Sequence, residues 1–228
     1  MTYVFPPQPQ ASLAIDGSSQ RFPLHRIYCV GRNYADHVKE MGGDVTRNAP
    51  VFFSKPATAL VSDNADVAYP QATQDLHHEV ELVICLAKGG KNISLEAAQA
   101  CVFGYSVGID FTRRDLQSEA KKGGKPWDVA KGFDNSAPVS QITPVDVSKP
   151  LSQAQIKLAV NGQQRQCGNI EDMIYSVAEV IMHLSTFFEL KAGDLIFTGT
   201  PAGVSAVGVG DKIQASIESV GSIEFTIV

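Results

Sequence analysis

Short runs of apolar residues alternate along the chain with polar segments that contain glycine, proline or asparagine. Apolar runs bounded by such turn-forming residues predict buried β-strands. They lie at residues 27–30, 51–56, 82–86, 102–109 and 195–204, the last ending in a turn of small residues. Residues 156–160 instead alternate between apolar and polar, and Asn161-Gly162 after them is a strong hairpin signal. The pattern therefore predicts many short strands, but it does not give the way in which they pair.

Three segments are predicted to be helices, and the apolar residues of the last one have the spacing of one buried face. The predicted helices span residues 34–41, 113–122 and 170–188. A polar residue directly before each one can cap its first turn, because a short side-chain oxygen accepts a hydrogen bond from a free backbone amide there. The expected caps are Asn33, Thr112 and Asn169. The predicted helices therefore lie between predicted strands along the chain.

The length and charge of the chain are those of an ordinary globular protein. Its 228 residues can form one large domain, and no repeat or linker is visible after residue 25. Asp16-Gly17 lies between two short apolar pieces and predicts a hairpin. We therefore expect residues 1–24 to form a small N-terminal cap on a domain that spans residues 25–228. A formal net charge of −5 argues against nucleic acid as the main partner.

Nothing in the sequence predicts contact with a membrane or an oxidising compartment. No apolar run approaches the length of a membrane span, and residues 1–7 lack the features of a secretory signal. The cysteines are widely spaced and most lie in apolar stretches, which favours buried free thiols over disulfides or a zinc cluster. They are Cys29, Cys85, Cys101 and Cys167. We expect a soluble cytoplasmic protein.

The candidate chemistry begins at Glu79 and Glu81, which lead into the apolar run at residues 82–86. Side chains two residues apart on a strand share a face, so the two carboxylates are predicted to lie side by side. Adjacent carboxylates repel each other unless one is protonated or a cation lies between them. An oxygen-rich site of this kind suits Mg²⁺, Mn²⁺ or Ca²⁺ better than zinc. A solvated strand face that carries glutamate is the alternative.

Asp110 follows directly after the apolar run at residues 102–109. The end of a buried strand is where enzymes built on sheets place ligands. Because Thr112 is expected to cap the next helix, Asp110 is free to act as the third ligand. His77 and His78 stay ambiguous: they could be metal ligands, hydrogen-bond donors to the ligands or polar loop residues.

His37 and Glu40 are three residues apart in the predicted helix and share one face. They are either a surface pair of small energetic effect or a general base with the carboxylate that orients it. Gly42-Gly43 ends this helix, and a mobile lid would hinge in the segment from there to about residue 49.

Two further features could contact an anionic ligand. Lys131 lies among small apolar residues, and a partly buried lysine needs a carboxylate or a ligand anion as its partner. The hydroxyls and backbone amides of residues 198–200 suit a carboxylate. In contrast, Lys121, Lys122 and Lys125 belong to a glycine-rich basic segment and are expected to be solvated.

Together, these residues resemble the motifs of the fumarylacetoacetate hydrolase family, in family order from about residue 25 to residue 228. The short, single-domain acylpyruvase or fumarylpyruvate hydrolase type, the group of FAH-domain-containing protein 1, is the most similar branch. The matching motifs are Gly-Arg-Asn-Tyr at 31–34 with His37 and Glu40, His-Glu-Val-Glu at 78–81, Gly-Ile-Asp-Phe-Thr at 108–112, Arg-Asp-Leu-Gln at 114–117, the segment 127–131, and Thr-Gly-Thr-Pro-Ala-Gly-Val at 198–204.

The resemblance implies a fold that the propensities alone do not give. It is an α+β, mostly β fold, in which a mixed and highly twisted β-roll has flanking helices, and it implies a homodimer. The resemblance also implies a divalent ion, Mg²⁺ or Mn²⁺, with Ca²⁺ as a substitute in crystals. Its expected ligands are Glu79, Glu81 and Asp110.

The implied activity is that of a metal-dependent hydrolase acting on a small oxo acid. Such an enzyme cleaves the C–C bond of a 1,3-diketo acid, an acylpyruvate such as fumarylpyruvate, to pyruvate and a carboxylic acid. His37, oriented by Glu40, would activate water, and Lys131 would stabilise the enolate that leaves. Substrate contacts are expected from Arg32, Gln117, Gly199 and Thr200.

Other functions remain open on the sequence. An oxaloacetate decarboxylase or tautomerase, or a 2-hydroxyhepta-2,4-diene-1,7-dioate isomerase/decarboxylase of aromatic catabolism, needs the same metal but no hydrolytic water. The intact pair of His37 and Glu40 speaks against pure decarboxylation. A noncatalytic binding protein would be expected to lack a ligand or the base, and the sequence keeps them all.

Overall fold

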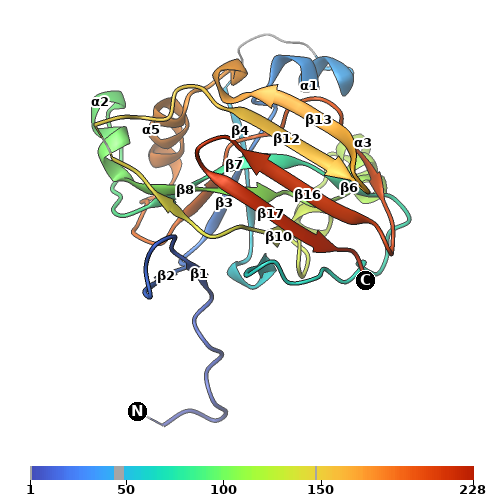
Figure 1. The fold of residues 1–228 in the computed structure, drawn as a ribbon, viewed down its shortest axis with the longest axis horizontal. Helices are drawn as coiled ribbons and strands as arrows, with labels where there is room; N and C mark the ends of the chain where they lie inside the picture. Colours follow the sequence, from blue (N-terminus) through green and yellow to red (C-terminus); the bar gives the residue numbers. More distant parts are fainter. Residues whose placement is uncertain (1, 44–48, 147) are drawn as a thin grey trace.

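The computed structural model describes residues 2–43, 49–146 and 148–228, and two twisted β-sheets form the body of the molecule (Figure 1). The larger sheet has six strands, in the order β11-β8-β7-β14-β3-β4. In that order they span Thr143–Pro144, Val102–Ile109, Val80–Leu86, Leu195–Phe197, Ile27–Gly31 and Val51–Lys55. The sheet is mixed, because β14 pairs with β3 in parallel and the other neighbours pair antiparallel.

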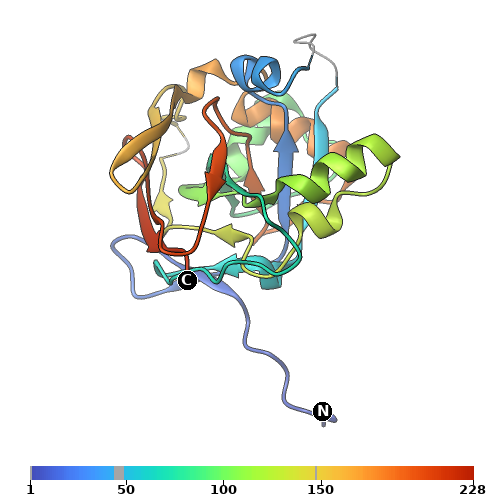
Figure 2. The same cartoon turned by 90° about the vertical axis from the view of Figure 1, so that its right-hand side faces the viewer.

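The second sheet has four antiparallel strands, in the order β13-β12-β16-β17, and lies over one face of the first (Figures 1 and 2). In that order they span Gln163–Asn169, Gln155–Val160, Lys212–Ile217 and Gly221–Thr226. Leu82 of β7, Leu158 of β12 and Phe225 of β17 belong to one buried cluster. The main core therefore lies between the two sheets.

A second apolar cluster lies on the other face of the six-stranded sheet. Val83 of β7 belongs to it, whereas Leu82 next to it belongs to the main core. Because side chains of a strand alternate between its faces, a strand covered on both faces has a continuous apolar run. The hairpin of β1 (Ser12–Ala14) and β2 (Arg21–Pro23) adds Leu13 and Phe22 to this cluster.

Smaller elements cover the margins of the sheets. β15, β6 and β9 form a three-stranded sheet that spans Ser205–Val207, Leu76–His78 and Thr112–Arg113. β5 (Leu60–Val61) pairs in parallel with β10 (Ala137–Pro138). The α-helices are α1 Ala35–Glu40, α2 Leu95–Ala98, α3 Arg114–Gly123, α4 Asp128–Lys131 and α5 Val177–Phe187. Short 3₁₀ helices span Ala57–Ala59, Gln99–Cys101 and Ile170–Asp172.

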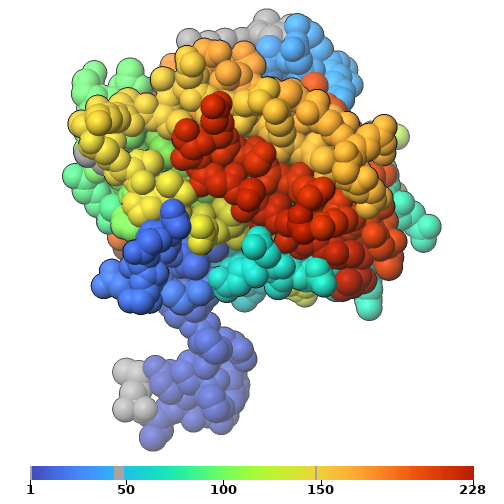
Figure 3. All heavy atoms as spheres, viewed as in Figure 1, coloured from blue at the N-terminus to red at the C-terminus, as the bar shows by residue number. Residues whose placement is uncertain are grey.

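The first residues extend away from the body of the molecule (Figure 3). Tyr3, Val4 and Phe5 are exposed, whereas Leu13 and Phe22 of the hairpin that follows are buried. The division into residues 1–24 and 25–228 stays a prediction. No helix in the described part of the chain is long and apolar enough to cross a membrane.

Most of the predicted elements are confirmed. The apolar runs form β3, β4, β7, β8 and β14, and both predicted hairpins are present as β1–β2 and β12–β13. The fold is mostly β, as the family resemblance implies. The cysteines are free, with only Cys167 exposed.

Two predicted helix caps are wrong, because each side chain makes tertiary hydrogen bonds instead. The residue before α1 is Tyr34, and Asn33 is buried with its amide bound to the carbonyl oxygens of Tyr175 and Thr198 at 3.0 and 2.7 Å. Arg113 precedes α3, and Thr112 lies in β9, where its hydroxyl accepts a hydrogen bond from Lys131 at 2.6 Å. Both side chains thus support the candidate site.

The predicted helix over residues 170–188 is in fact two elements. Asn169 caps only the 3₁₀ helix Ile170–Asp172, and the chain then straightens. α5 begins after Ser176, whose hydroxyl accepts a hydrogen bond from the amide of Glu179, while the Glu179 carboxylate accepts one from the amide of Ser176. This second reciprocal cap starts α5 as a separate helix.

Candidate active site and metal centre

Three buried carboxylates meet at the ends of two neighbouring strands. Glu81 is the second residue of β7, and Asp110 follows the last residue of β8. Glu79 lies just before β7, outside the strand in which it was predicted. Because Val80 pairs with Ile109 in the antiparallel register, Glu79 comes opposite Asp110, and the Asp110 amide donates to the Glu79 carbonyl oxygen at 2.8 Å. One oxygen from each carboxylate lies within 4.8 Å of the others.

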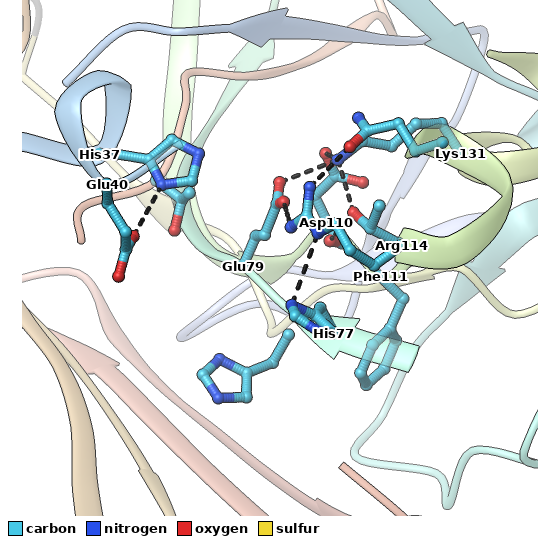
Figure 4. A network of polar contacts seen from close by, with 12 residues as sticks. His37, Glu40, His77, Glu79, Asp110, Phe111, Arg114 and Lys131 are labelled. Atoms are coloured by element: carbon cyan, nitrogen blue, oxygen red, sulfur yellow. Dashed lines mark hydrogen bonds and ion pairs between the residues drawn. The ribbon is translucent and has the colours of Figure 1, made fainter. Parts of the chain in front are cut away.

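Three cations face two of these carboxylates, and Figure 4 shows two of them, Lys131 and Arg114. Lys131 lies 2.8 Å from Glu79 and 2.6 Å from Asp110, and Arg114 forms an ion pair with the other oxygen of Glu79. Lys55, buried at the end of β4, lies 2.8 Å from Asp110 and also donates to the carbonyl oxygens of residues 111 and 131. These contacts fix both carboxylates in place.

Glu81 has no such ion pair among the residues that the structure describes. Its oxygen accepts a hydrogen bond from the backbone amide of Gly199 at 2.6 Å. Burial raises the pKa of Glu81 well above its usual value, and the charges of Asp110 and Glu79 raise it further. Burial acts in the same direction on Glu79, but Lys131 and Arg114 outweigh it and hold that pKa well below its usual value.

The donor set therefore fits a hard divalent cation. A buried carboxylate that lacks a cationic partner and lies beside two others is stabilised in its charged form by an ion bound between them. All the donor atoms are carboxylate oxygens, which favour Mg²⁺ or Mn²⁺ over zinc or copper. The three residues predicted as ligands are thus brought together in a geometry that could hold such an ion.

The contact between Glu81 and Gly199 depends on glycine. Gly199 has φ +98°, a left-handed conformation that side chains rarely adopt, and a β-carbon there would lie 2.7 Å from that of Asn33. The turn can therefore bring its amide to Glu81 only without a side chain. A contact between Gly199 and the substrate stays a prediction, because here its amide supports the carboxylate.

His37 and Glu40 form a second group at the same pocket. His37 Nδ1 lies 3.2 Å from one carboxylate oxygen of Glu40, and the other oxygen accepts a hydrogen bond from the amide of Gly203 at 3.0 Å. Figure 4 shows this pair on one side of the site and the network of Glu79, Asp110 and Lys131 on the other. Glu40 thus connects α1 to the turn after β14 and fixes the ring of His37.

Most of the predicted site residues line one pocket. Its walls include Arg32, His37, Glu79, Glu81, Asp110, Gln117, Lys131, Gly199 and Thr200. Glu40 lies behind His37 and does not line it. Gly42 and Gly43, the predicted hinge, also line the pocket, and residues 44–48 of the predicted lid lie outside the described residues.

The two histidines beside Glu79 are not part of the carboxylate cluster. His78 is buried, with Nδ1 2.9 Å from Gln166 and Nε2 2.9 Å from Ser205. Burial lowers the pKa of His78 to about 4, which keeps the ring neutral near pH 7. His77 lies 2.8 Å from Asp75 and accepts a hydrogen bond from Arg114 at 3.4 Å. Both histidines therefore support neighbours of the ligands.

The predicted site residues do not include four that hold or line the site: Lys55 and Arg114 beside the carboxylates, and Gln166 and Lys121. Gln166 of β13 is fully buried and donates to the hydroxyl of Thr200, and nothing in the local sequence marks it. Lys121 is exposed, as expected, but it also lines the pocket from α3. Here a signal existed, because Arg114, Gln117 and Lys121 have the spacing of one helix face.

A sequence model of the fumarylacetoacetate (FAA) hydrolase C-terminal region matches residues 26–228. The chain belongs to the fumarylacetoacetate hydrolase family. This match confirms the resemblance of the sequence motifs. The family contains hydrolases and isomerases.

The similar members of the fumarylacetoacetate hydrolase family are named for one of two activities. The rat mitochondrial oxaloacetate tautomerase FAHD1 is 44% identical over 201 residues, which cover 88% of this chain and 90% of the relative. Oxaloacetate tautomerase YcgM of Escherichia coli is 40% identical over 203 residues, 89% and 92% of the two chains. The crystal structure of fumarylpyruvate hydrolase from Pseudomonas aeruginosa, in complex with Mn²⁺ and pyruvate, is 47% identical with a TM-score of 0.96 and covers 100% of this chain and 99% of that one.

Proposed function

We propose that the protein is a divalent-metal-dependent hydrolase that cleaves the C–C bond of an acylpyruvate such as fumarylpyruvate. The observation that carries this proposal is that His37, held by Glu40, lines the same pocket as the three carboxylates. The similarity to a fumarylpyruvate hydrolase whose structure contains Mn²⁺ and pyruvate supports both the metal and the 2-oxo acid.

Glu79, Glu81 and Asp110 would hold Mg²⁺ or Mn²⁺. When bound, the ion would supply Lewis-acid polarisation at the 2-oxo acid end of the substrate. The protein itself fixes the carboxylates through Lys131, Arg114 and the Gly199 amide, so little reorganisation is needed as the ligands assemble.

His37 would act as the general base. Glu40 is 3.2 Å from Nδ1, so that nitrogen carries the proton, and the lone pair of Nε2 is left for the pocket. Nε2 would take a proton from water as the water oxygen adds to the distal carbonyl carbon of the substrate. The charge of Glu40 stabilises the imidazolium that forms, as the orienting carboxylate of a catalytic triad does.

The C–C bond between that carbon and the methylene carbon would then break. Its electron pair leaves with the three-carbon fragment as the enolate of pyruvate, and the other fragment leaves as a carboxylic acid. The imidazolium of His37 returns its proton to the methylene carbon, which gives pyruvate. Burial lowers the pKa of Lys131, but Asp110 and Glu79 outweigh it and raise the pKa, so an ammonium is present to stabilise the enolate.

Two polar side chains in the pocket would orient the substrate. The hydroxyl oxygen of Thr200 accepts a hydrogen bond from Gln166, which leaves the hydroxyl hydrogen to donate to a substrate carboxylate. The side-chain carbonyl oxygen of Gln117 accepts a hydrogen bond from Arg114 at 2.6 Å. This contact fixes the orientation of the Gln117 amide group in the pocket. We propose both residues as substrate contacts, with Arg32 at the mouth.

Oxaloacetate tautomerisation is the second candidate, because two similar relatives carry that name. Oxaloacetate would bind at the same carboxylate cluster through the divalent ion held there, with Lys131 beside it. His37 would take a proton from the methylene carbon, the carbonyl oxygen would gain a proton from the imidazolium or from water, and no water would add to the substrate. The two candidates therefore differ in whether the base acts on water or on carbon.

One experiment tests both candidates. Purified protein with Mn²⁺ is incubated with fumarylpyruvate, acetylpyruvate and oxaloacetate, and the ultraviolet absorbance and released pyruvate are followed. Hydrolysis predicts pyruvate from the acylpyruvates, with the rate reduced about 10²–10⁴-fold in His37→Asn. Tautomerisation predicts only interconversion of the enol and keto forms of oxaloacetate. Metal binding measured by calorimetry is expected to persist in His37→Asn, and its loss would contradict the assignment of this residue as the base.

We also propose that the protein acts in the cytoplasm as a homodimer. The buried free thiols of Cys29, Cys85 and Cys101 support a reducing compartment, and the family resemblance supports the dimer. Light scattering of the purified protein would give its mass in solution, and a monomer at micromolar concentration would contradict the dimer.

A further inference from the structure

We propose that Lys121 and Arg32 bind a second carboxylate at the mouth of the pocket, so that the preferred substrates are long dicarboxylic oxo acids. This inference rests on the proposed function and deepens it. Neither acetylpyruvate, which has one carboxylate, nor oxaloacetate, whose second carboxylate is next to the reacting carbons, would use this contact fully.

The first support is the balance of charges along the pocket. In its inner part, the carboxylates of Glu79 and Asp110 are already matched by buried cations. Lys121 and Arg32 line the same pocket, yet neither forms an ion pair with any residue that the structure describes. The pocket of a protein with a net charge of −5 therefore has positive charge at its mouth that no carboxylate of the chain neutralises.

The surroundings of Lys121 also favour a bound anion. Its ammonium lies 5.2 Å from the ring centroid of Trp127, within the range of a cation–π contact. Burial lowers the pKa of Lys121, and the nearby charges of Arg114 and Arg32 lower it further, which outweighs the opposite effect of Glu79. Cations that crowd one another in this way are stabilised by an anion between them.

Arg32 is placed by an unusual backbone conformation. It directly follows β3 and has φ +63°, which is uncommon for a residue with a side chain and costs free energy. Nothing in the described contacts of Arg32 offsets that cost. This conformation places the guanidinium of Arg32 at the pocket, where a ligand carboxylate can pair with it.

Phe53 and Trp127 form an aromatic wall of the pocket, and the extent of this wall sets the expected length of the substrate. The ammonium of Lys131, beside Glu79 and Asp110, is 5.1 Å from the ring of Phe53. That ring is 6.0 Å from Trp127, which in turn contacts Lys121. Lys121 and the carboxylate cluster thus lie at opposite ends of this wall. A planar unsaturated chain, such as a fumaryl group, could lie along it and reach the mouth with its far carboxylate.

Kinetics of matched variants test this inference. Lys121→Met is expected to lower the ratio of kcat/KM for fumarylpyruvate to that for acetylpyruvate by about tenfold, the size of one charge-assisted contact. Lys121→Arg keeps the charge and should retain most of the ratio. The control is Lys122→Met, a neighbouring exposed lysine of α3 that does not line the pocket. An unchanged ratio in Lys121→Met would overturn the inference.

Binding without turnover gives an independent measurement. Trp127 is the only tryptophan of the chain and contacts Lys121, so its fluorescence reports on ligands at the mouth. Fumarate is expected to bind the wild type about tenfold more tightly than crotonate, its analogue with one carboxylate, and this difference should vanish in Lys121→Met. Equal binding of the two acids by the wild type would contradict the inference.

The two proposals fail in different ways. If the wild type turned over none of the oxo acids, the proposed function would be wrong. If it hydrolysed acetylpyruvate as well as fumarylpyruvate and Lys121→Met changed neither, the proposed function would stand and the second carboxylate site would be wrong.

Discussion

Gln166 shows how one buried amide can organise a site that it does not itself line. Its carbonyl oxygen accepts from the Nδ1 of His78 at 2.9 Å and from the amide of Val80 at 3.1 Å. Its NH₂ group donates to the hydroxyl of Thr200 and the carbonyl oxygen of Pro201, both at 2.8 Å. Gln166 therefore joins the segment that carries Glu79 to the turn that carries Thr200, and it decides which way the Thr200 hydroxyl donates.

We predict that Gln166→Glu weakens both the fold and substrate binding. The new side chain keeps the acceptor for His78 and Val80 but loses the donors to Thr200 and Pro201. Loss of buried hydrogen bonds is expected to lower the free energy of unfolding by about 1–3 kcal/mol. KM for fumarylpyruvate should rise more than kcat falls, because Thr200 would lose its orientation. Denaturant unfolding and steady-state kinetics measure the two effects.

The matched control for this change is Gln164→Glu, on an exposed side chain of the same strand. It should leave both quantities within experimental error. A Gln166→Glu protein with unchanged KM would mean that Thr200 does not orient the substrate through Gln166.

At this scale, the sequence predicts the carboxylates but not what holds them. Glu79, Glu81 and Asp110 lie at the ends of apolar runs, so local spacing marks them as candidates, and the family resemblance favours them over a solvated strand face. Gln166 contacts His78 across 88 residues of sequence, and Gly199 contacts Glu81 across 118. Such contacts depend on how the sheets pack, which no local pattern contains.

Among the elements, α3 is tied to the loop before β6 by the carboxylate of Asp115. One oxygen accepts from the Thr73 hydroxyl at 2.7 Å and the Leu116 amide at 2.9 Å, and the other accepts from the Gln74 amide at 3.0 Å. Burial raises the pKa of Asp115, but these hydrogen bonds outweigh it and lower the pKa below its usual value. α3 carries Arg114, Gln117 and Lys121, so this tie positions one wall of the pocket.

We predict that Asp115→Asn lowers the free energy of unfolding by about 1 kcal/mol at pH 7, since hydrogen bonds to a charged acceptor are replaced by weaker ones in partial contact with solvent. Because the folded-state pKa is the lower one, the stabilisation by Asp115 is fully present above the unfolded-state pKa near 4 and disappears as the pH falls through the folded-state value. Urea unfolding of the two proteins from pH 7 to pH 3 measures the difference.

Glu119→Gln, on an exposed side chain of the same helix, is the control and should show neither the loss nor the pH dependence. A difference between Asp115→Asn and the wild type that stays constant down to pH 3 would contradict the role of the charge.

The elements also show where local rules compete. Asn169 and Ser176 each begin a reciprocal cap, with Asp172 and Glu179 as their partners. The predicted helix rests on the first signal alone and joins both elements, because the apolar spacing continues across the break. A second cap inside a periodic stretch is thus a stronger sign of a break than the periodicity is of continuity.

For the molecule as a whole, strand order is the part that the sequence could not give. β14 lies between β7 and β3 in the sheet although it comes late in the chain, and this places the Gly199 turn beside Glu81. Propensities predict strands without their neighbours, so the β-roll could be expected only through the family resemblance. The site depends on this order, since its residues come from both ends of the sequence.

The whole fold should respond to metal through Glu81. An ion that binds only the folded state raises stability by mass action, and we predict that excess Mn²⁺ raises the unfolding temperature on the order of 5 °C above that in a chelator. Glu81→Gln should unfold without metal at or above the wild-type temperature, because the raised pKa of Glu81 already favours an uncharged side chain there. With Mn²⁺ the variant should gain almost nothing, whereas Glu119→Gln should gain as much as the wild type. Differential scanning calorimetry with and without metal separates these outcomes, and a full Mn²⁺ response in Glu81→Gln would place the ion elsewhere.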